Sequence, residues 1–126
     1  MPGSSLDQTT LDRLEGAIEI DAVTPRSDGS TSSRPIWVVV VDGDAYVRSY
    51  HGPRGAWYRR AREDGRLTLV SDGVDIDADA EPALDDDVNR RVSEAYRAKY
   101  GARSPGSTES MVEPEISQTT LRLTQP

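Results

Sequence analysis

The chain has 126 residues, of which 22 are acidic and 15 basic, so its net charge is −7, and it contains no cysteine. This composition excludes disulfides, thiolate metal sites and cysteine nucleophiles, and nucleic acid is not an expected partner because phosphate binding needs a basic face. No apolar run approaches the ~18 residues of a membrane-spanning helix, and the first residues do not form a secretory signal. We therefore expect no membrane partner, a cytoplasmic location and, from the length, one domain over residues 1–126.

The N-terminal quarter reads as a helical arm, a strand and a loop. Apolar residues at positions 6, 11 and 14 predict a short helix within an arm that spans residues 1–16. Alternating apolar and polar residues predict a half-exposed strand over 17–23. Residues 24–33 are rich in Pro, Ser, Asp and Gly and are expected to form a loop.

The most apolar part of the chain reads as a hairpin followed by a corner. Residues 36–41 are apolar at every position, which predicts a strand that is buried on both faces. Asp42-Gly43 is typical of a two-residue turn with positive φ at both positions, so a return strand is expected over 45–50. Residues 51–55 contain two glycines and a proline, and they predict a tight corner before a short helix over 56–63.

The C-terminal half predicts two strands, a long helix and a last strand. The predicted strands are 66–70 and 74–81, and we interpret the carboxylates that alternate along the second as a solvated sheet edge rather than a metal or acid–base array. Residues 85–101 have acids at the start, an apolar stripe and a final glycine, which together indicate a helix. Residues 102–117 are expected to form the loop before a final strand over 119–124.

The order of these elements favours a mainly β fold. About six strands are mostly joined by hairpins, and no strand–helix–strand rhythm with a Gly-rich phosphate loop is present. A Rossmann fold is therefore not expected. A small antiparallel β-barrel, closed or split, with helices packed outside fits the pattern best.

Cationic and aromatic residues cluster in sequence beside the most apolar strand. A local cationic pocket within an acidic protein favours a small anion over a polymer, and the aromatic rings favour a flat one. The residues of this cluster are Arg48, His51, Arg54, Trp57, Tyr58, Arg59 and Arg60.

Three members of the cluster each have two interpretations. Arg48 either clamps a phosphate or carboxylate with both arms of its guanidinium or forms a structural salt bridge. Trp57, just after Gly55 at the predicted helix start, either stacks on a planar ring beside a bound anion or anchors the helix on the barrel. His51, the only histidine, is either a general acid or base or an exposed loop residue, and with no partner it predicts no metal site.

Several blocks of the sequence agree in order and spacing with one bacterial family. The chain resembles the family catalogued as domain of unknown function 2255 over most of residues 17–124. More distantly, it is similar to the FMN-binding split barrels, which include pyridoxamine-phosphate oxidases and deazaflavin-dependent reductases. The blocks are Trp37–Val41, Asp42-Gly43, Tyr46–Ser49, Gly55–Arg59, Ala95–Gly101, Met111-Val112 and Thr119–Thr124.

The resemblance implies a six-stranded antiparallel split β-barrel, usually a homodimer, and from the wider fold group an FMN or deazaflavin cofactor. Our first hypothesis is accordingly a flavin- or deazaflavin-dependent oxidoreductase that acts on a small organic molecule. Candidate catalytic residues are His51 and Tyr50. Candidate cofactor-binding residues are Arg34, Trp37, Arg48, Ser49, Arg54, Trp57, Tyr58 and Arg59.

Two other hypotheses stay open. The deazaflavin-dependent reductases usually carry a Gly-Lys pair before the first long strand, whereas here Arg34 is the only cation in residues 28–34. The second hypothesis is therefore a cofactor-free barrel that binds a small organic molecule, as an enzyme or a carrier in a specialised biosynthetic pathway. The third is a dimeric structural module with no small-molecule site.

Overall fold

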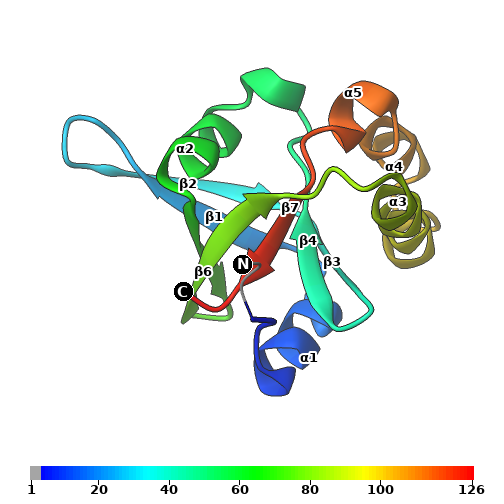
Figure 1. The fold of residues 1–126 in the computed structure, drawn as a ribbon, viewed down its shortest axis with the longest axis horizontal. Coiled ribbons are helices and arrows are strands. Elements are labelled where there is room, and N and C mark those ends of the chain that lie inside the picture. Colours follow the sequence, from blue (N-terminus) through cyan, green and yellow to red (C-terminus); the bar gives the residue numbers. More distant parts are fainter. Residues whose placement is uncertain (1–3) are drawn as a thin grey trace.

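A curled antiparallel sheet forms the centre of the protein in the computed structural model, which describes residues 4–126 (Figure 1). Residues 1–3 of the expected N-terminal arm lie outside the described residues. The sheet order is β2-β1-β5-β6-β7-β4-β3, and every pairing is antiparallel. The strands are β1 (Ile20–Pro25), β2 (Thr31–Ile36), β3 (Val38–Val41), β4 (Asp44–Val47), β5 (Arg66–Ser71), β6 (Val74–Pro82) and β7 (Leu121–Thr124).

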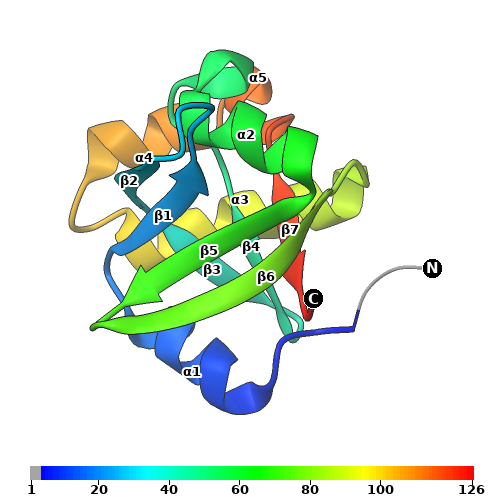
Figure 2. The same cartoon turned by 90° about the vertical axis from the view of Figure 1, so that its left-hand side faces the viewer.

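Helices surround this sheet on the outside. The first two α-helices lie at opposite ends of the curled sheet, and the last three lie beside the β3–β4 hairpin (Figures 1 and 2). The helical segments are α1 (Gln8–Gly16), the 3-10 turn η1 (Gly52–Arg54), α2 (Ala56–Asp64), α3 (Asp86–Tyr100), α4 (Pro105–Met111) and α5 (Pro114–Ser117). The predicted mainly β class with outer helices is confirmed.

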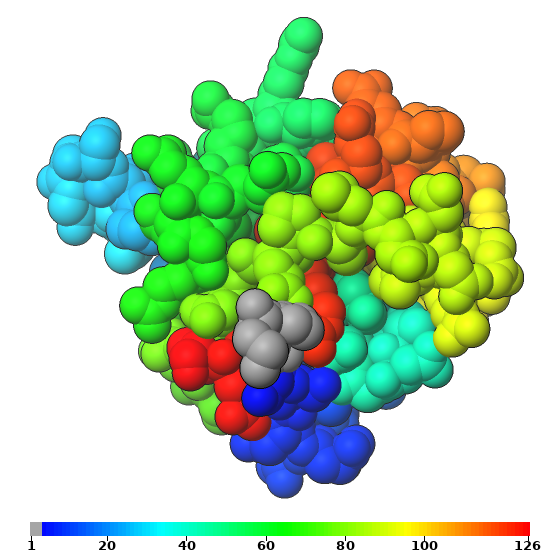
Figure 3. All heavy atoms as spheres, viewed as in Figure 1, coloured from blue at the N-terminus to red at the C-terminus, as the bar shows by residue number. Residues whose placement is uncertain are grey.

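The two ends of the described chain are tied together. Ser5 bridges Thr124 of β7, and the backbone N–H of Gln125 donates to the Ser4 carbonyl at 2.8 Å. Figure 3 shows the N-terminal segment in blue against the C-terminal strand in red. The approach to α1 is thereby held against the last strand.

The β3–β4 hairpin separates two hydrophobic cores. Val38 and Val47 face the core inside the curled sheet, whereas Val39 and Tyr46 face the core under α3. Because both faces are covered, the expectation of a doubly buried apolar strand is confirmed for this segment. The turn at Asp42-Gly43 has φ of 49° and 81°, as the sequence predicted.

The structure differs from the sequence prediction in its strand count. Residues 24–33, predicted as a loop, belong largely to a hairpin in which Thr24 pairs with Ser32, and the strand predicted over 36–41 is interrupted at Trp37. Residues 4–126 thus hold seven strands rather than six. The reason is that β2 is mostly polar, so it lacks the apolar alternation that marks a strand.

Two further predictions were wrong. Residues 102–117 contain the short helices α4 and α5, each with a proline in its first turn, instead of a loop. The acidic strand β6 is not an edge, because it pairs with β5 on one side and β7 on the other. Two of its outward carboxylates meet cations on the neighbouring strands, Asp79 with Arg66 of β5 and Glu81 with Arg122 of β7, and Asp77 accepts from the Thr68 hydroxyl.

Candidate functional site

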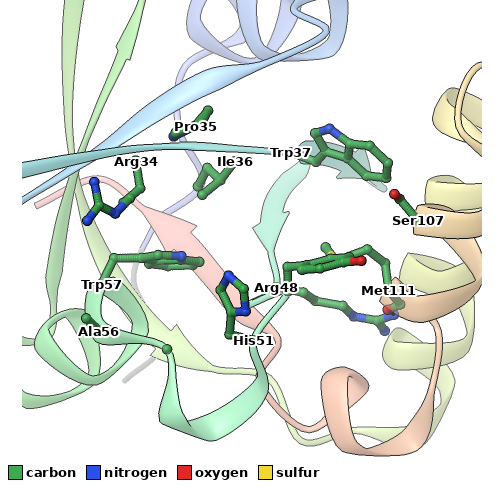
Figure 4. Close-up of a pocket in the computed structure, with 12 residues that line it drawn as sticks. Arg34, Pro35, Ile36, Trp37, Arg48, His51, Ala56, Trp57, Ser107 and Met111 are labelled. Atoms are coloured by element: carbon green, nitrogen blue, oxygen red, sulfur yellow. Dashed lines mark hydrogen bonds between the residues drawn. The ribbon is translucent and has the colours of Figure 1, made fainter.

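A cavity of about 470 Å³ lies between the β2–β3 connection and the corner that joins β4 to α2, and α4 contributes to one end (Figure 4). Small-molecule sites in proteins have volumes of ~300–1,000 Å³. None of the twelve lining residues is acidic, although the chain carries 22 acidic residues. The lining consists of Arg34, Pro35, Ile36, Trp37, Arg48, Tyr50, His51, Gly55, Ala56, Trp57, Ser107 and Met111.

The cavity has two different ends. Figure 4 shows Arg34 beside Trp57 at one end, with Trp37, Ser107 and Met111 at the other. His51 lies between the two ends, below the β2–β3 connection in this view. One end therefore offers an exposed cation beside an indole, and the other end offers an indole and a thioether.

The corner after β4 gives the cavity one of its walls. Gly52 has φ of 73°, which suits glycine, and its N–H donates to the Ser49 carbonyl at 2.9 Å. The next glycine, Gly55, precedes α2 without a side-chain cap. A Cβ at Gly55 would lie 2.3 Å from Ser49 Oγ, a hydroxyl that is fully buried and has no hydrogen-bond partner among the described residues. With Ser49 in this position, a side chain at residue 55 would collide with its hydroxyl, so glycine suits the start of α2.

Arg48 is the most heavily bonded side chain in the site, and it is 1% exposed. Its Nε donates to Thr120 Oγ1 at 2.9 Å. Nη1 donates to Ser93 Oγ and to the Met111 carbonyl, both at 2.9 Å. Nη2 donates to the Asn89 carbonyl at 3.0 Å and to Asn89 Oδ1 at 3.3 Å. All the N–H groups of a guanidinium are thus engaged, and Arg48 ties α3, α4 and the approach to β7 onto β4.

Neither interpretation of Arg48 describes these contacts. A clamp on a ligand would require protein hydrogen bonds to break, and the acceptors are hydroxyl, amide and carbonyl oxygens rather than carboxylates. Burial lowers the pKa of Arg48, yet a guanidinium stays protonated at neutral pH. Arg48 therefore carries a buried positive charge that no carboxylate in these contacts neutralises.

Trp37 is held in place by α3. Its ring stacks on that of Tyr100, with ring centres 4.1 Å apart and planes within 3°. The Tyr100 hydroxyl donates to the Ile18 carbonyl at 2.7 Å, and burial raises the pKa of Tyr100 to about 12, so this donor stays protonated. Lys99, also on α3, donates from Nζ to the carbonyl of Val38, the residue after Trp37, at 2.7 Å, which holds this part of the chain against the helix. The indole at this end of the cavity is a fixed wall.

Trp57 and the two candidate catalytic residues occupy different parts of the lining. Trp57 is 6% exposed and belongs to the inner core as well as the cavity, so it both anchors α2 and borders the site. Tyr50 is 49% exposed, and the His51 ring lies edge-on to it with centres 5.5 Å apart. The phenol and imidazole are therefore accessible from solvent and from the cavity.

The structure brings together six of the ten predicted site residues and leaves four out. Ser49 is buried behind Gly55, and Tyr58 is buried with its hydroxyl bonded to Arg62 at 2.9 Å. Arg54 and Arg59 are exposed and do not line the cavity. The six lining residues are Arg34, Trp37, Arg48, Tyr50, His51 and Trp57.

Sequence reasoning also missed half of the lining. Pro35, Ile36, Gly55 and Ala56 are neighbours of predicted residues, and their position in the chain was the available signal. Met111 belonged to a block of the family resemblance without a role, and Ser107 lay in the predicted loop. No local pattern marks Ser107, because α4 reaches the cavity only through tertiary packing.

Comparison with known proteins identifies the family. Residues 10–123 match the family described as "Uncharacterized protein conserved in bacteria (DUF2255)". The chain belongs to this family. Among curated proteins, none matches the sequence.

Solved structures of low sequence identity share the fold of this DUF2255 protein. A conserved hypothetical protein, Rv2991 from Mycobacterium tuberculosis, has a TM-score of 0.67 and 16% identity, covering 98% of this chain and 81% of that one. A putative pyridoxamine 5'-phosphate oxidase from Listeria innocua has a TM-score of 0.58 and 14% identity, over 91% and 87% of the chains. An F420-H2 dependent reductase (FDR-A) has a TM-score of 0.58 and 11% identity, over 97% and 99%. These likenesses confirm the split-barrel fold.

Membrane-spanning helices and clustered metal ligands are both absent from residues 4–126. Within residues 4–126, no helix combines the length and the apolar character needed to cross a membrane. The same part of the chain has no group of three or more His, Cys, Asp or Glu residues placed to hold a metal ion.

Proposed function

We propose that the cavity binds FMN or a deazaflavin cofactor and that the protein is an oxidoreductase acting on a small organic molecule. The observation that carries the proposal is a cavity lined by two indoles, two arginines and a histidine without any acid, in a strongly acidic chain. Split-barrel proteins described as a putative pyridoxamine 5'-phosphate oxidase and an F420-H2 dependent reductase share its fold and support this proposal.

The lining residues fit a planar, anionic group. Arg34 is exposed at the mouth, and its one observed hydrogen bond goes to the adjacent Ser33 carbonyl at 3.4 Å, so it is free to turn toward a phosphate. The uncapped start of α2 beside Trp57 adds backbone N–H groups at the same end. Trp37, Ile36 and Met111 give the apolar surface that a ring system needs. A bound cofactor of this class supplies hydride transfer.

The chain itself contributes placement and a proton. Trp37, fixed on Tyr100, sets the plane against which a ring lies, and Trp57 excludes water from the opposite end. His51 and Tyr50 border the cavity with a titratable imidazole and a phenol, and they supply or accept the proton that accompanies reduction of a substrate. Arg48 contributes charge rather than hydrogen bonds.

One observation favours the cofactor-free alternative. Every Arg48 N–H is engaged by the protein, which leaves Arg34 as the one lining arginine whose guanidinium is available to a phosphate. A smaller organic anion needs fewer such contacts than a full cofactor does. In that case the protein binds a small organic molecule with His51 and Tyr50 as acid–base groups.

Assembly as a homodimer is part of both proposals, and light scattering of the purified protein tests it.

The test is the absorption spectrum of the purified protein, followed by titration with FMN and with F420. We expect a spectral shift at micromolar cofactor, and an Arg34→Ala variant is expected to bind at least about tenfold more weakly because a charge-assisted contact is lost. Arg13→Ala, an exposed change on α1 outside the cavity, is the matched control and should bind like the parent. No shift with either cofactor would favour the cofactor-free alternative.

A further inference from the structure

Arg48 places a positive charge without a carboxylate partner at the wall of the cavity. The residue lines the cavity, and Figure 4 shows its guanidinium at the Met111 end. All its observed hydrogen bonds go to neutral oxygens. Every N–H donor therefore has an acceptor, but no negative charge among these partners balances the positive charge. In a poorly hydrated interior such a charge acts over several ångströms, because little solvent screens it.

No acidic group in the lining opposes this charge. From α3, the Tyr96 ring lies 5.5 Å from Arg48 Cζ, and burial raises the pKa of that phenol, so it is neutral. From α4, Ser107 and Met111 face the cavity without charge. The remaining titratable or charged groups of the lining are Tyr50, His51 and Arg34, which are phenolic or basic.

Because the protein already uses every N–H donor of Arg48, its positive charge stabilises some classes of bound anion and not others. A carboxylate or phosphate at this end would lose its hydration and find no free donor on the guanidinium, which is costly. An anion whose charge is spread over a ring needs fewer donors and still gains from the positive field. A localised acid instead suits the other end, where the Arg34 side chain is exposed.

We propose that the cavity selects weakly acidic planar molecules, such as phenols, enols or cyclic imides, and binds their conjugate bases with the ring against Trp37 and its delocalised charge within the field of Arg48. This inference rests on the proposed function in one respect, namely that the same cavity is the ligand site. It extends that function by naming the class of ligand, and it applies with or without a cofactor.

The probe is 7-hydroxycoumarin, whose ionisation changes its absorption, with 7-methoxycoumarin as a partner that cannot ionise. We expect the phenolate to bind at least about tenfold more tightly than the phenol, which lowers the midpoint of the bound probe's titration by at least one pH unit. The comparison is repeated in His51→Asn, so that the protonation of the imidazole does not enter the pH profile. Equal affinity for both forms, or no binding of either coumarin, would overturn the proposal.

A pair of variants at Ser93 isolates the charge of Arg48. Ser93 Oγ accepts from Arg48 Nη1 at 2.9 Å, so Ser93→Asp puts a carboxylate on the guanidinium, and Ser93→Asn puts a neutral group of the same size there. We expect the aspartate variant to lose most of the preference for the phenolate and the asparagine variant to keep it. Equal preferences in the two variants would overturn the assignment to Arg48, and if the aspartate variant does not fold, the titration of the parent protein still decides the main claim.

The result is separable from that of the cofactor titration. Phenolate selection without any binding of FMN or F420 would support this inference and the cofactor-free alternative together. Cofactor binding without phenolate selection would leave the proposed function standing and remove the inference.

Discussion

An Arg48→Met variant is expected to lose at least about 4 kcal/mol of its free energy of unfolding, or not to fold. Methionine fills a similar volume but donates nothing. The Ser93 and Thr120 hydroxyls, the Asn89 side chain and the Met111 carbonyl then lose the donor that holds them together in a buried place. Urea denaturation followed by circular dichroism measures the loss.

Two further substitutions test the reason for that loss. Arg48→Lys keeps the positive charge but cannot reproduce the planar fork, so it should also be destabilised. Arg90→Met, which removes an exposed arginine of α3 that forms surface ion pairs, should change the free energy of unfolding by less than about 1 kcal/mol. An Arg48→Met protein within 1 kcal/mol of its parent would show that this network does not stabilise the fold as described.

A Gly55→Ala variant is expected to lose about 1–3 kcal/mol of the free energy of unfolding. The backbone angles at Gly55 suit alanine, with φ of −57° and ψ of 133°, so the cost comes from crowding alone. The new methyl group would lie 2.3 Å from Ser49 Oγ, so either the buried Ser49 hydroxyl must rotate or α2 must move away from the segment after β4. Because Gly55 lines the cavity, ligand affinity should fall together with stability.

Removing the crowding hydroxyl should restore much of the loss. In Gly55→Ala/Ser49→Ala, the nearest remaining Ser49 atom is its Cβ, 3.6 Å from the new methyl group, which is an ordinary contact. Ser49→Ala alone should be close to neutral, since the hydroxyl has no observed partner. Gly106→Ala in α4, where a Cβ meets nothing within 4 Å, is the control for a harmless addition. A double variant no more stable than Gly55→Ala would contradict the crowding.

The sequence predicted those parts of the fold that depend on local patterns. The continuous apolar run over residues 36–41 and the Asp42-Gly43 turn located the hairpin beside the site, because these signals arise within a few residues. The strand β2 was missed because only two of its residues, Ser32 and Ile36, are buried. Since Ser32 is polar, the sequence shows no apolar alternation there. The helix α4 was missed because its seven residues include a proline, a glycine and two serines and show no apolar stripe, and its packing against α3 is a tertiary effect.

The site residues were predicted because they lie near one another in the sequence. This explains why some of them line the cavity and others do not. Residues after β4 do meet at one cavity, but Trp57 and Arg59 are two positions apart on a helix and so face different directions. The environment of Arg48 was beyond such reasoning, because its hydrogen-bond partners lie 41 to 72 residues away along the chain. The sequence indicated that Arg48 belongs to the site, but its hydrogen-bond partners could be identified only from the folded structure.

The most direct measurement is the fluorescence of the chain's two tryptophans, Trp37 and Trp57, which both line the cavity. Trp37→Phe and Trp57→Phe each leave a single indole, and both variants are titrated with FMN, F420 and 7-hydroxycoumarin. If a planar anion binds between the two ends, at least one of these compounds will change the emission of both single-tryptophan variants with dissociation constants that agree within a few-fold. Emission that stays constant in both variants with all three compounds would contradict the site itself.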